Sequence, residues 1–599
     1  MNPEANELNT YDYIVVGSGA GGGPLAANLA KAGYAVLLME AGGRDENLTS
    51  DIPVFHAKAS EDPAIKWDYY IKHYANEQRQ SQDWDSKFVA EQDGVRRDGI
   101  LYPRAGTLGG CTAHNAMITV YPHSSDWDHL AALTGDTSWS GANMRQYFER
   151  LEQCTYYPGT GIWAFFRKVL ECLHLLPRNA ARHGSKGWLT TSTVDPHLVF
   201  GDHQLIAVIK SAVKEALDAH VGNPAARLGS ELDPNDWRLA TESPEGVAVT
   251  PLATRVLLDD GKPPMAEGVE YMEGNSLYRA DPRAYANKHD PARKQVFARR
   301  EVIVAAGAFN TPQLLMLSGI GPRAELERFK IPVRVDLPGV GANLQDRYEV
   351  GVVTKFKQDF SLLKGASFAV PAPGQAPDPF MTLWKEGKGL YTSNGAVIGI
   401  IKRSKDERPN PDLYIFGLPG EFKGYYPGYS DLLGKRNNYF TWAILKAHTN
   451  NTAGTVTLRS DDPRDMSEIN FHYFDEGNDR FGEDMESVVA GVQFVREMNK
   501  RIALFEHEEK IPGPDYQTED QIRDFVKRNA WGHHASCTCK MGAEDDATAV
   551  LDSKFRVRGV NHLRVVDASV FSRIPGMFIV TAIYMISEKA SDDILDAAK

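Results

Sequence analysis

The chain has 599 residues, of which 42% are hydrophobic and 24% are charged, a balance typical of globular proteins. One hydrophobic core stops growing at roughly 250–300 residues, so this length predicts at least two lobes. The 66 basic and 79 acidic residues give a net charge of −13, which argues against nucleic acid as a partner, because binding DNA needs a basic face.

The N-terminal stretch MNPEANELNTYDY is polar and acidic, so it does not resemble a signal peptide. No run of about 18 apolar residues follows it, and no transmembrane span is expected. The five cysteines, an odd number without a regular spacing, are typical of a protein in a reducing compartment. Together these features predict a cytoplasmic enzyme.

A βαβ unit is predicted directly after this stretch. Its parts are a buried strand at Tyr11–Val16, a turn at Gly17–Gly23, a helix at Pro24–Ala32 and a second strand at Ala35–Glu40. Two strands that are joined through a helix in this way imply a parallel sheet.

The turn of this unit carries the pattern G-x-G-x-x-G at Gly17, Gly19 and Gly22. The first glycine permits a tight turn, the second lets the backbone approach a pyrophosphate, and the third lets helix and strand pack closely. The helix N-terminus adds N–H donors for an anion. Glu40 ends the second strand, where its carboxylate can bind ribose hydroxyls. The unit is therefore predicted to bind a dinucleotide, and this motif alone does not separate FAD from NAD.

An apolar segment follows at Tyr156–Leu176, where aromatic and aliphatic side chains approximate one helical face. Arg167, Lys168 and Glu171 are interleaved with them. Three interpretations stay open for this segment: an amphipathic helix packed on the protein, a contact with a membrane surface, and an apolar lid over a substrate channel.

Further elements of a nucleotide-binding domain are predicted in the middle and at the end of the chain. They are strands at 302–306 and 563–566 and helices at 311–318 and 582–598. The stretches between them are rich in aromatic residues, loops and alternating strand patterns such as TVTLRS at 455–460. The polar stretches 70–100 and 275–296 are expected to be surface excursions.

This interleaving predicts one discontinuous cofactor domain with a substrate domain inserted into it. The cofactor domain is expected to comprise 1–150, 226–345 and 516–599, and the substrate domain 151–225 and 346–515.

Four segments resemble signatures of the glucose–methanol–choline (GMC) oxidoreductases. They are RAGTLGGCTAHNAM at Arg104–Met117, GAFNTPQLLMLSGIG at Gly307–Gly321, WGHHASCTCKMG at Trp531–Gly542 and VVDAS at Val565–Ser569. The second is a complete match, whereas Cys111 in the first stands where the family usually has serine. The resemblance implies an α/β fold, in which a discontinuous Rossmann-type FAD-binding domain (GMC or p-hydroxybenzoate hydroxylase-like) carries an inserted α+β substrate-binding domain.

The same resemblance implies where the flavin is contacted. The expected residues are Gly17, Gly19, Gly22, Glu40, Ala41, Arg104, Gly109, Gly110, His114, Asn115, Ala116, Val256, Ala306, Gly307, Asp567 and Ala568. Asp567 matches an aspartate that faces the flavin's ribityl or pyrophosphate region. In some members of the family, choline oxidase among them, a histidine immediately before the asparagine carries FAD covalently through its 8α carbon. His114 occupies that position, and both a covalent and a non-covalent FAD stay open.

The catalytic residues follow from the Trp531–Gly542 segment. Aligning its threonine, methionine and glycine places His534 at the family's invariant histidine, which takes the substrate hydroxyl proton while hydride passes to flavin N5. His533 is the rival assignment. The family's second catalytic histidine or asparagine falls near Phe578, with Val580 as the other register, and neither side chain can exchange a proton. No metal is expected.

The expected function is therefore oxidation of a CH–OH group in an alcohol or sugar-like substrate. Phe578 leaves an alternative open, a flavoprotein of this fold with non-redox or light-driven chemistry of the lyase or decarboxylase type. A non-catalytic binding protein is a third possibility. The sequence does not indicate whether the electron acceptor is oxygen or a quinone. An apolar or aromatic-lined substrate cavity is expected from Phe578 and from the aromatic residues Phe416, Phe422, Tyr425, Tyr426, Tyr429, Tyr439, Phe440 and Trp442.

Overall fold

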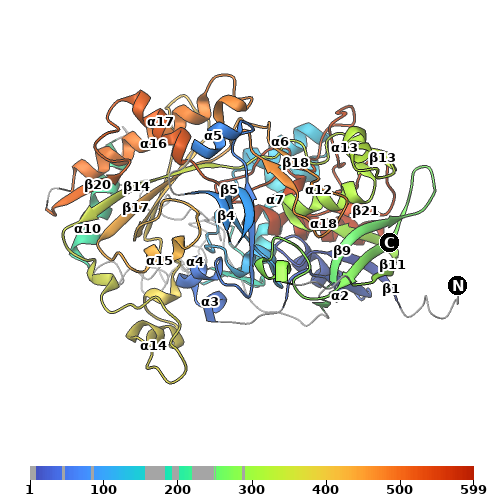
Figure 1. The fold of residues 1–599 in the computed structure, drawn as a ribbon, viewed down its shortest axis with the longest axis horizontal. Coiled ribbons are helices and arrows are strands. Elements are labelled where there is room, and N and C mark those ends of the chain that lie inside the picture. Colours follow the sequence, from blue (N-terminus) through green and yellow to red (C-terminus); the bar gives the residue numbers. More distant parts are fainter. Residues whose placement is uncertain are drawn as a thin grey trace, which may run out of the picture.

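The computed structural model describes residues 9–43, 48–82, 87–92, 94–155, 182–191, 201–218, 248–249, 251–286, 291–502 and 504–599. The segment Tyr156–Leu176 lies outside these residues, as does the expected boundary at 225/226. Two large sheets lie toward opposite ends of the molecule in Figure 1, and a small sheet lies between them. Within the described residues, the helices are all too short or too polar to cross a membrane.

The larger sheet has seven strands and the predicted parallel core. Its strand order is β8-β2-β1-β11-β10-β9, and β21 also pairs with β11. The pairs β8–β2, β2–β1, β1–β11 and β11–β21 are parallel, whereas β10 runs antiparallel to both β11 and β9. The strands are β1 (Thr10–Val16), β2 (Val36–Met39), β8 (Ala248–Val249), β9 (Pro251–Leu258), β10 (Ala266–Glu273), β11 (Arg293–Val304) and β21 (Leu563–Val565).

The strand β11 is longer than the strand predicted at 302–306. Along one edge it pairs with two other strands in succession, β10 and then β21. Its first half, at 293–297, pairs with β10, and its last three residues, 302–304, pair with β21. Only that last part is fully buried. The apolar run VIV therefore marked the buried end of β11, while the more polar stretch before it gave no strand signal.

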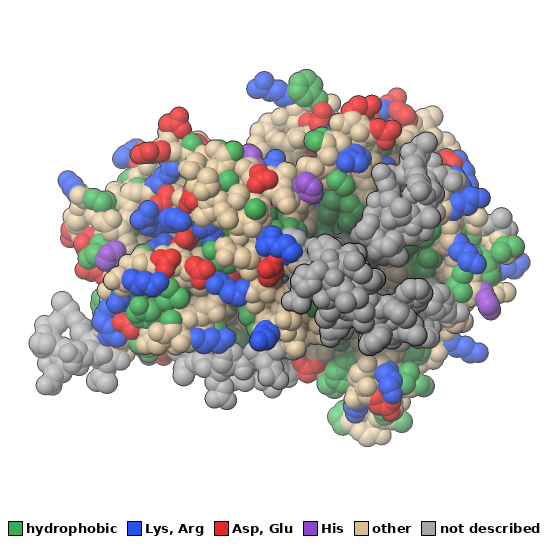
Figure 2. Space-filling model, turned by 180° about the vertical axis from the view of Figure 1, so that it is seen from behind, with side chains coloured by type: hydrophobic (Ala, Val, Ile, Leu, Met, Phe, Trp, Pro, Cys, Tyr) green, Lys and Arg blue, Asp and Glu red, His purple; other side chains and the backbone are tan. Residues whose placement is uncertain are grey.

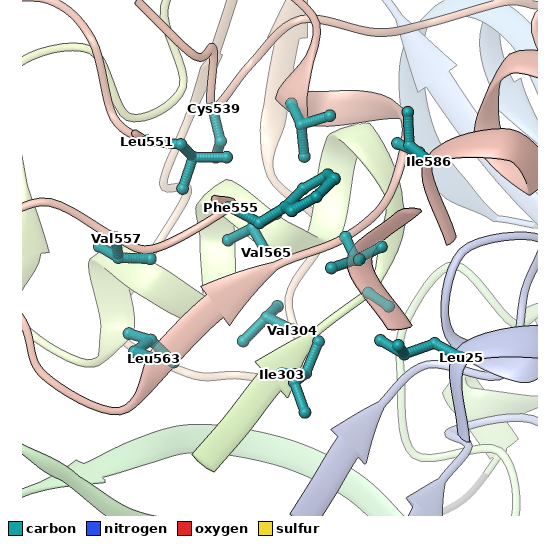
Figure 3. Close-up of a cluster of buried hydrophobic side chains, with 14 of the residues drawn as sticks. Leu25, Ile303, Val304, Cys539, Leu551, Phe555, Val557, Leu563, Val565 and Ile586 are labelled. Carbon is teal, nitrogen blue, oxygen red and sulfur yellow. The ribbon is translucent and has the colours of Figure 1, made fainter. Parts of the chain in front are cut away.

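A buried core holds this sheet against two helices, α2 (Gly22–Lys31) and α18 (Val580–Ala597). Figure 3 shows Leu25 and Ile586 with Val304 and Val565 in one cluster of apolar side chains. Both helices begin two residues before their predicted starts, at Gly22 and Val580. The helix α12 (Gly307–Leu317) likewise begins four residues early. For these three helices the predicted element type is confirmed, and the main differences lie at their starts.

The second sheet has five antiparallel strands in the order β15-β16-β17-β14-β20. These are β14 (Tyr348–Phe356), β15 (Ile398–Lys402), β16 (Leu413–Pro419), β17 (Tyr439–Lys446) and β20 (His507–Ile511). The helix α16 (Glu483–Lys500) packs on it, with α17 (Glu519–Asn529) beside α16 (Figure 1).

Side chains alternate between the two faces of β16. Leu413 and Ile415 join the core cluster that includes the buried side of α16. Tyr414 and Phe416 instead lie against Phe578, with Tyr414 and Phe578 ring centroids 5.1 Å apart. One face of this sheet is thus core, and the other approaches the C-terminal part of the chain.

A third sheet corrects the expectation of surface excursions. It has the order β3-β5-β4, formed by β3 (Lys66–Ile71), β4 (Phe88–Gln92) and β5 (Val95–Ala105). Ile71, Ile100 and Tyr102 in it are buried. In 275–296, the second stretch that was expected at the surface, Leu277 and Tyr278 are buried as well. The expectation was wrong because the polar first part of β5 is followed by a consecutive buried run at 99–103, which the average polarity of the stretch concealed.

The remaining elements connect these layers. The helices are α3 (Leu48–Asp51), α4 (His56–Ala59), α5 (Glu77–Gln82), α6 (Ser124–Thr134), α7 (Gly141–Leu151), α10 (His203–Asp218), α13 (Arg323–Arg328), α14 (Pro379–Lys385) and α15 (Tyr429–Leu433). The short strand pairs are β6 (Glu152–Cys154) with β7 (Leu189–Thr191), β12 (Ile320–Gly321) with β13 (Val335–Asp336), and β18 (Thr455–Thr457) with β19 (Glu468–Asn470). Figure 2 shows acidic and basic side chains interspersed on one face of the molecule.

Candidate active site

A cavity of about 430 Å³ lies between the two large sheets. This volume is within the usual range of small-molecule and cofactor sites. Most of the residues singled out in the sequence line it, although they come from distant parts of the chain. They are Gly17, Gly19, Glu40, Ala41, Arg104, Gly110, His114, Asn115, Ala116, Ala306, Gly307, His533, His534, Asp567, Ala568 and Phe578.

Three expected flavin contacts, Gly22, Gly109 and Val256, do not line the cavity but lie behind its wall. A Cβ on Gly22 would come within 2.0 Å of the Gly17 carbonyl oxygen, so this glycine allows the helix to pack. The Gly109 N–H donates to Ser18 Oγ at 2.9 Å, and the Val256 N–H donates to Ser318 Oγ at 2.8 Å. Gly109 thus ties the cavity-lining loop to the glycine turn, and Val256 anchors the end of α12.

The glycine turn fits a pyrophosphate. Gly17 has a φ of +106° and passes so close to Ala305 that a Cβ would lie 2.3 Å from its carbonyl oxygen. A Cβ on Gly19 would instead enter open space, with its nearest heavy atom, the Gly109 carbonyl oxygen, 3.9 Å away. Gly19 lines the cavity just before the N-terminus of α2. The backbone here is therefore open to a bound anion, as an FAD pyrophosphate requires.

Two buried carboxylates hold the cavity-lining loops in place. Glu40 accepts hydrogen bonds from the Ser18 N–H at 3.0 Å and the Gly42 N–H at 2.9 Å, and burial raises its pKa. Asp567 accepts from the Gly307 N–H at 2.9 Å, at the start of α12. Both side chains line the cavity, so each combines a position suited to the cofactor with a local structural role.

A basic side chain and a thiol lie together on the 104–117 loop. Arg104 Nη1 is 3.9 Å from Cys111 Sγ. Burial raises the pKa of the Cys111 thiol, but the Arg104 guanidinium and His114 outweigh this and lower it to about 6. The replacement of the family's usual serine therefore brings an ionisable group into the cavity wall. The Nε2 atom of His114 is buried and, among the described residues, has no hydrogen-bond partner.

The segment that carries the two candidate histidines is held by backbone pairing with the residues just before and at the start of β14. Gln345 pairs with Ser536, and Glu349 pairs with Trp531. The His534 N–H donates to Asp346 Oδ1 at 2.8 Å. These two isolated bridges and the hydrogen bond to Asp346 fix His533 and His534 beside β14, although the two segments are far apart in sequence.

The His534 side chain is buried near the charged side chains of Arg104 and Arg347. Burial lowers its pKa well below 6.5, and His533, Arg347 and Arg104 lower it further. The ring centroids of His533 and His534 are 3.9 Å apart. At neutral pH His534 is therefore uncharged, which is the state in which an imidazole accepts a proton.

Next to His534, the second expected catalytic position is apolar. The Phe578 ring is 5.4 Å from the His534 ring, nearly perpendicular to it at 85°. The Gly576 N–H donates to Asp126 Oδ2 at 3.0 Å, which fixes the approach to Phe578. Val580 also lines the cavity. Both registers considered in the sequence thus place an apolar side chain at this wall.

The expected aromatic lining is present in part. Phe416, Phe422, Tyr425 and Tyr429 line the cavity. The other four aromatic residues of this region, Tyr426, Tyr439, Phe440 and Trp442, do not. Phe440 and Trp442 belong to the core of the five-stranded sheet, because β17 is buried along nearly its whole length. Aromatic composition alone could not separate the cavity wall from the core.

Among the lining residues that the sequence analysis did not single out are two with ionisable side chains close to the candidate site, Glu349 and His56. Glu349 is fully buried in β14, and the available signal was a carboxylate inside the otherwise apolar strand YEVGVV. His56 Nε2 lies 3.2 Å from the Asn394 carbonyl oxygen, and burial lowers its pKa to about 4. Its neighbourhood in the sequence carries no motif, so it could not have been identified.

Glu349, His533 and His534 also offer potential metal-ligand atoms within 4.8 Å of one another. The charges around them argue against a divalent cation. Arg104 and Arg347 already place two positive charges near His534, and their effect on its pKa shows that they act on this site. We therefore interpret this group through proton chemistry rather than metal binding.

Comparisons with known proteins agree with the geometry. Two family models, both described as GMC oxidoreductase, match residues 240–349 and 450–587. An oxygen-dependent choline dehydrogenase from Vibrio vulnificus is 30% identical over 597 residues, covering 98% of this chain and 94% of that protein. One from Rhizobium rhizogenes is 29% identical over 608 residues, covering 98% of this chain and 95% of that protein.

Solved structures share the fold at lower identity. Pyridoxine 4-oxidase from Mesorbium loti superposes with a TM-score of 0.68 at 18% identity, covering 97% of this chain and 98% of that one. A formate oxidase variant from Aspergillus oryzae RIB40 gives a TM-score of 0.72 at 20% identity, covering 98% of both chains. These likenesses extend over nearly the whole chain and concern its architecture.

Proposed function

The chain belongs to the GMC oxidoreductase family and is a FAD-dependent oxidoreductase of the alcohol-oxidising class, and we propose that His534 is the base of its reaction. The observation that carries the proposal is the position of His534. It is a buried, neutral imidazole on the same cavity that the glycine turn opens into. A base that is uncharged at working pH and close to the substrate hydroxyl is what CH–OH oxidation needs.

The residues that line the cavity have separate roles in the proposed reaction. FAD, when bound, supplies an acceptor for the hydride of the substrate carbon. His534 removes the hydroxyl proton at a ring nitrogen, so that the carbonyl forms as the hydride leaves. Phe578 cannot take part in proton transfer, but its ring packs against that of His534 in the cavity wall, where it keeps water away from the base. Asp567 and Glu40 hold the loops against which the cofactor lies.

The substrate proposed is an alcohol with an apolar or aromatic part. Phe416, Phe422, Tyr425 and Tyr429 offer ring surface along the same cavity as Phe578. Apolar walls with few polar groups bind such substrates by burial and orient them by one or two hydrogen bonds. The similarity to oxygen-dependent choline dehydrogenases favours oxygen as the electron acceptor, with a quinone as the alternative.

Phe578 also supports a second candidate function. Because Phe578, at the position where the family has its second proton-transfer residue, is apolar and packs against His534, the same flavin site suits non-redox or light-driven chemistry of the lyase or decarboxylase type. This candidate differs from the first in one measurable respect, because its substrate leaves no electrons on the flavin at the end of the reaction.

An anaerobic screen tests the main proposal. Benzylic, aliphatic and sugar-like alcohols are mixed with the holoenzyme in the dark, and bleaching of the flavin absorbance is followed. We expect at least one alcohol to bleach it, with slower bleaching when the carbinol hydrogen is replaced by deuterium. Re-oxidation by oxygen or by a soluble quinone then identifies the acceptor. Substrate turnover without any bleaching, either in the dark or in a parallel illuminated sample, would favour the second candidate instead.

We further propose that His114 carries FAD covalently. Its Nε2 atom is buried at the cavity without a hydrogen-bond partner among the described residues, so it is free to bond the flavin's 8α carbon. Formation of this bond releases one proton and leaves two electrons on the flavin, which oxygen or a quinone removes. Acid precipitation should then give a yellow pellet, and the peptide holding Cys111–Met117 should carry the flavin's mass.

The His114→Ala variant is the comparison for this experiment. It should release all its flavin into the supernatant on acid treatment, while still binding FAD before treatment through the glycine turn. A colourless pellet from the unaltered enzyme would show that the flavin is held by non-covalent contacts alone. That result would leave the assignment of His534 untouched.

A further inference from the structure

The carboxyl group of Glu349 is buried without conventional hydrogen bonds. The residue is fully buried, and within the described part of the chain neither carboxylate oxygen has a hydrogen-bond partner. The backbone N–H and C=O of Glu349 are both satisfied, because Glu349 and Trp531 exchange two backbone hydrogen bonds, of 3.0 and 2.9 Å. A buried carboxylate needs donors or a counter-charge, so the groups facing it decide what it does.

Two imidazoles face this carboxylate. His533 Nδ1 is 3.1 Å from Glu349 Oε1, without the alignment of a hydrogen bond, and His534 Nδ1 is 3.8 Å from the same oxygen. Because the two nitrogens of an imidazole lie on different edges of the ring, an Nδ1 directed at Glu349 leaves Nε2 of His534 for the substrate. Hydrogen bonds at active sites are often long until substrate binds.

Other charges reach the two histidines from several elements. The titratable or charged groups around His534 are Glu349, Asp346, His533, Arg347 and Arg104. Those around His533 are Glu349, Asp346, Tyr425, His56, His534 and Arg104, whose Nη1 donates to the His533 carbonyl oxygen at 3.4 Å. Asp346 is already engaged, since it accepts from the Tyr102 hydroxyl at 2.5 Å and from the backbone N–H groups of Arg347 and His534. Glu349 is therefore the carboxylate left to respond to a proton on either ring.

We propose that Glu349 is the positioning residue of His534: it holds Nδ1–H toward itself, presents Nε2 to the substrate hydroxyl, and neutralises the imidazolium that forms. The inference rests on the proposed function of His534. In the step itself, the substrate O–H bond breaks and an Nε2–H bond forms, while the hydride leaves for FAD. The proton on Nε2 is released when oxygen or a quinone takes up two electrons and two protons in re-oxidation, which completes the balance.

His533 has the opposite electrostatic effect on the same ring. It lies closer to Glu349 than His534 does, and it lowers the pKa of His534. Removing Glu349 and removing His533 should therefore shift the protonation of His534 in opposite directions. General damage to the site would not produce shifts of opposite sign, so this contrast separates positioning from a structural role.

The test uses the holoenzyme and two readouts. Deuterium exchange at the C2 hydrogen of His534, followed by mass spectrometry across pH, reports its protonation without any substrate. Flavin reduction by an alcohol, followed by rapid mixing, reports its action as a base. Glu349→Gln should move the exchange midpoint of His534 to lower pH and slow reduction on the order of 10- to 10²-fold, less than loss of the base itself. His533→Gln should move the midpoint to higher pH.

Two further variants complete the design. Glu349→Asp keeps the charge, so it should restore the midpoint and part of the rate. Asp484→Asn removes another buried carboxylate, whose partners are the backbone N–H groups of Asn450 and Asn451 and which does not line the cavity. It should lower thermal stability but leave both readouts unchanged.

The inference is overturned if Glu349→Gln slows reduction without moving the midpoint, or if the Glu349 and His533 variants shift it in the same direction. It is likewise overturned if Glu349→Gln changes neither readout. If no alcohol reduces the flavin of the unaltered enzyme, the proposed function fails, yet the exchange experiment still measures whether Glu349 controls His534.

Discussion

A Gly19→Val variant is expected to be purified folded but without flavin. A Cβ at this position meets no atom closer than 3.9 Å, so the folded chain itself can accommodate it. The space it enters is the cavity beside the N-terminus of α2, where a pyrophosphate needs close approach to the backbone. A branched side chain fills that approach. The measurement is the ratio of flavin to protein absorbance after purification with FAD present throughout.

Gly201→Val serves as the comparison for this variant. Gly201 also has open space around its Cβ position and no left-handed backbone, but it does not line the cavity. It should bind FAD in full, with a thermal unfolding temperature close to that of the unaltered enzyme. A yellow, stoichiometric Gly19→Val protein would contradict the assignment of this turn to the pyrophosphate.

A His534→Ala variant is expected to keep its FAD and to reduce it on the order of 10²–10⁴-fold more slowly, the usual contribution of a positioned acid–base group. The side chain lies away from the glycine turn, so flavin binding does not depend on it. Rapid mixing with an alcohol under anaerobic conditions measures the rate. Because His534 is a base only when uncharged, and its pKa lies well below 6.5, the unaltered enzyme should keep its rate down to acidic pH.

The adjacent histidine provides the internal comparison. His533→Ala removes a ring whose side chain is only partly buried and whose Nδ1 faces Glu349 rather than the substrate. It should slow flavin reduction far less than His534→Ala does. The reverse order of effects would assign the base to His533 and shift the alignment of the Trp531–Gly542 segment by one residue.

The parts of the fold that were predicted from the sequence depend on local chemistry. The βαβ unit was recognisable because buried strands are short apolar runs and because a phosphate-binding turn needs glycines at fixed spacing. The division into two interleaved domains, read from the alternation of nucleotide-binding and aromatic-rich segments, stays a prediction. The parallel sheet and its two flanking helices are confirmed, with differences at the element ends, where apolar patterns are least informative.

The parts that were not predicted depend on contacts between distant segments. The sequence motif gave His534, with His533 as its rival, for one catalytic position. No local sequence pattern indicates that Gln345 and Glu349 pair with Ser536 and Trp531. Glu349 therefore had no visible connection to the histidines. The packed sheet in the polar 70–100 stretch was missed for a related reason, since its buried faces appear only when β3 and β4 align beside β5.

The position of β21 in the large sheet has a consequence for biosynthesis. Val302 of β11 is paired with Leu563, which is 563 − 302 = 261 residues further along the chain. At the usual pace of translation, a ribosome reaches that strand roughly 10–50 s later. Until then the nucleotide-binding sheet lacks β21, Asp567 and α18, and residues 302–304 of β11 lack their partner strand on that side. The nascent chain therefore cannot enclose its flavin during most of its synthesis, and cofactor capture becomes one of the last events of folding.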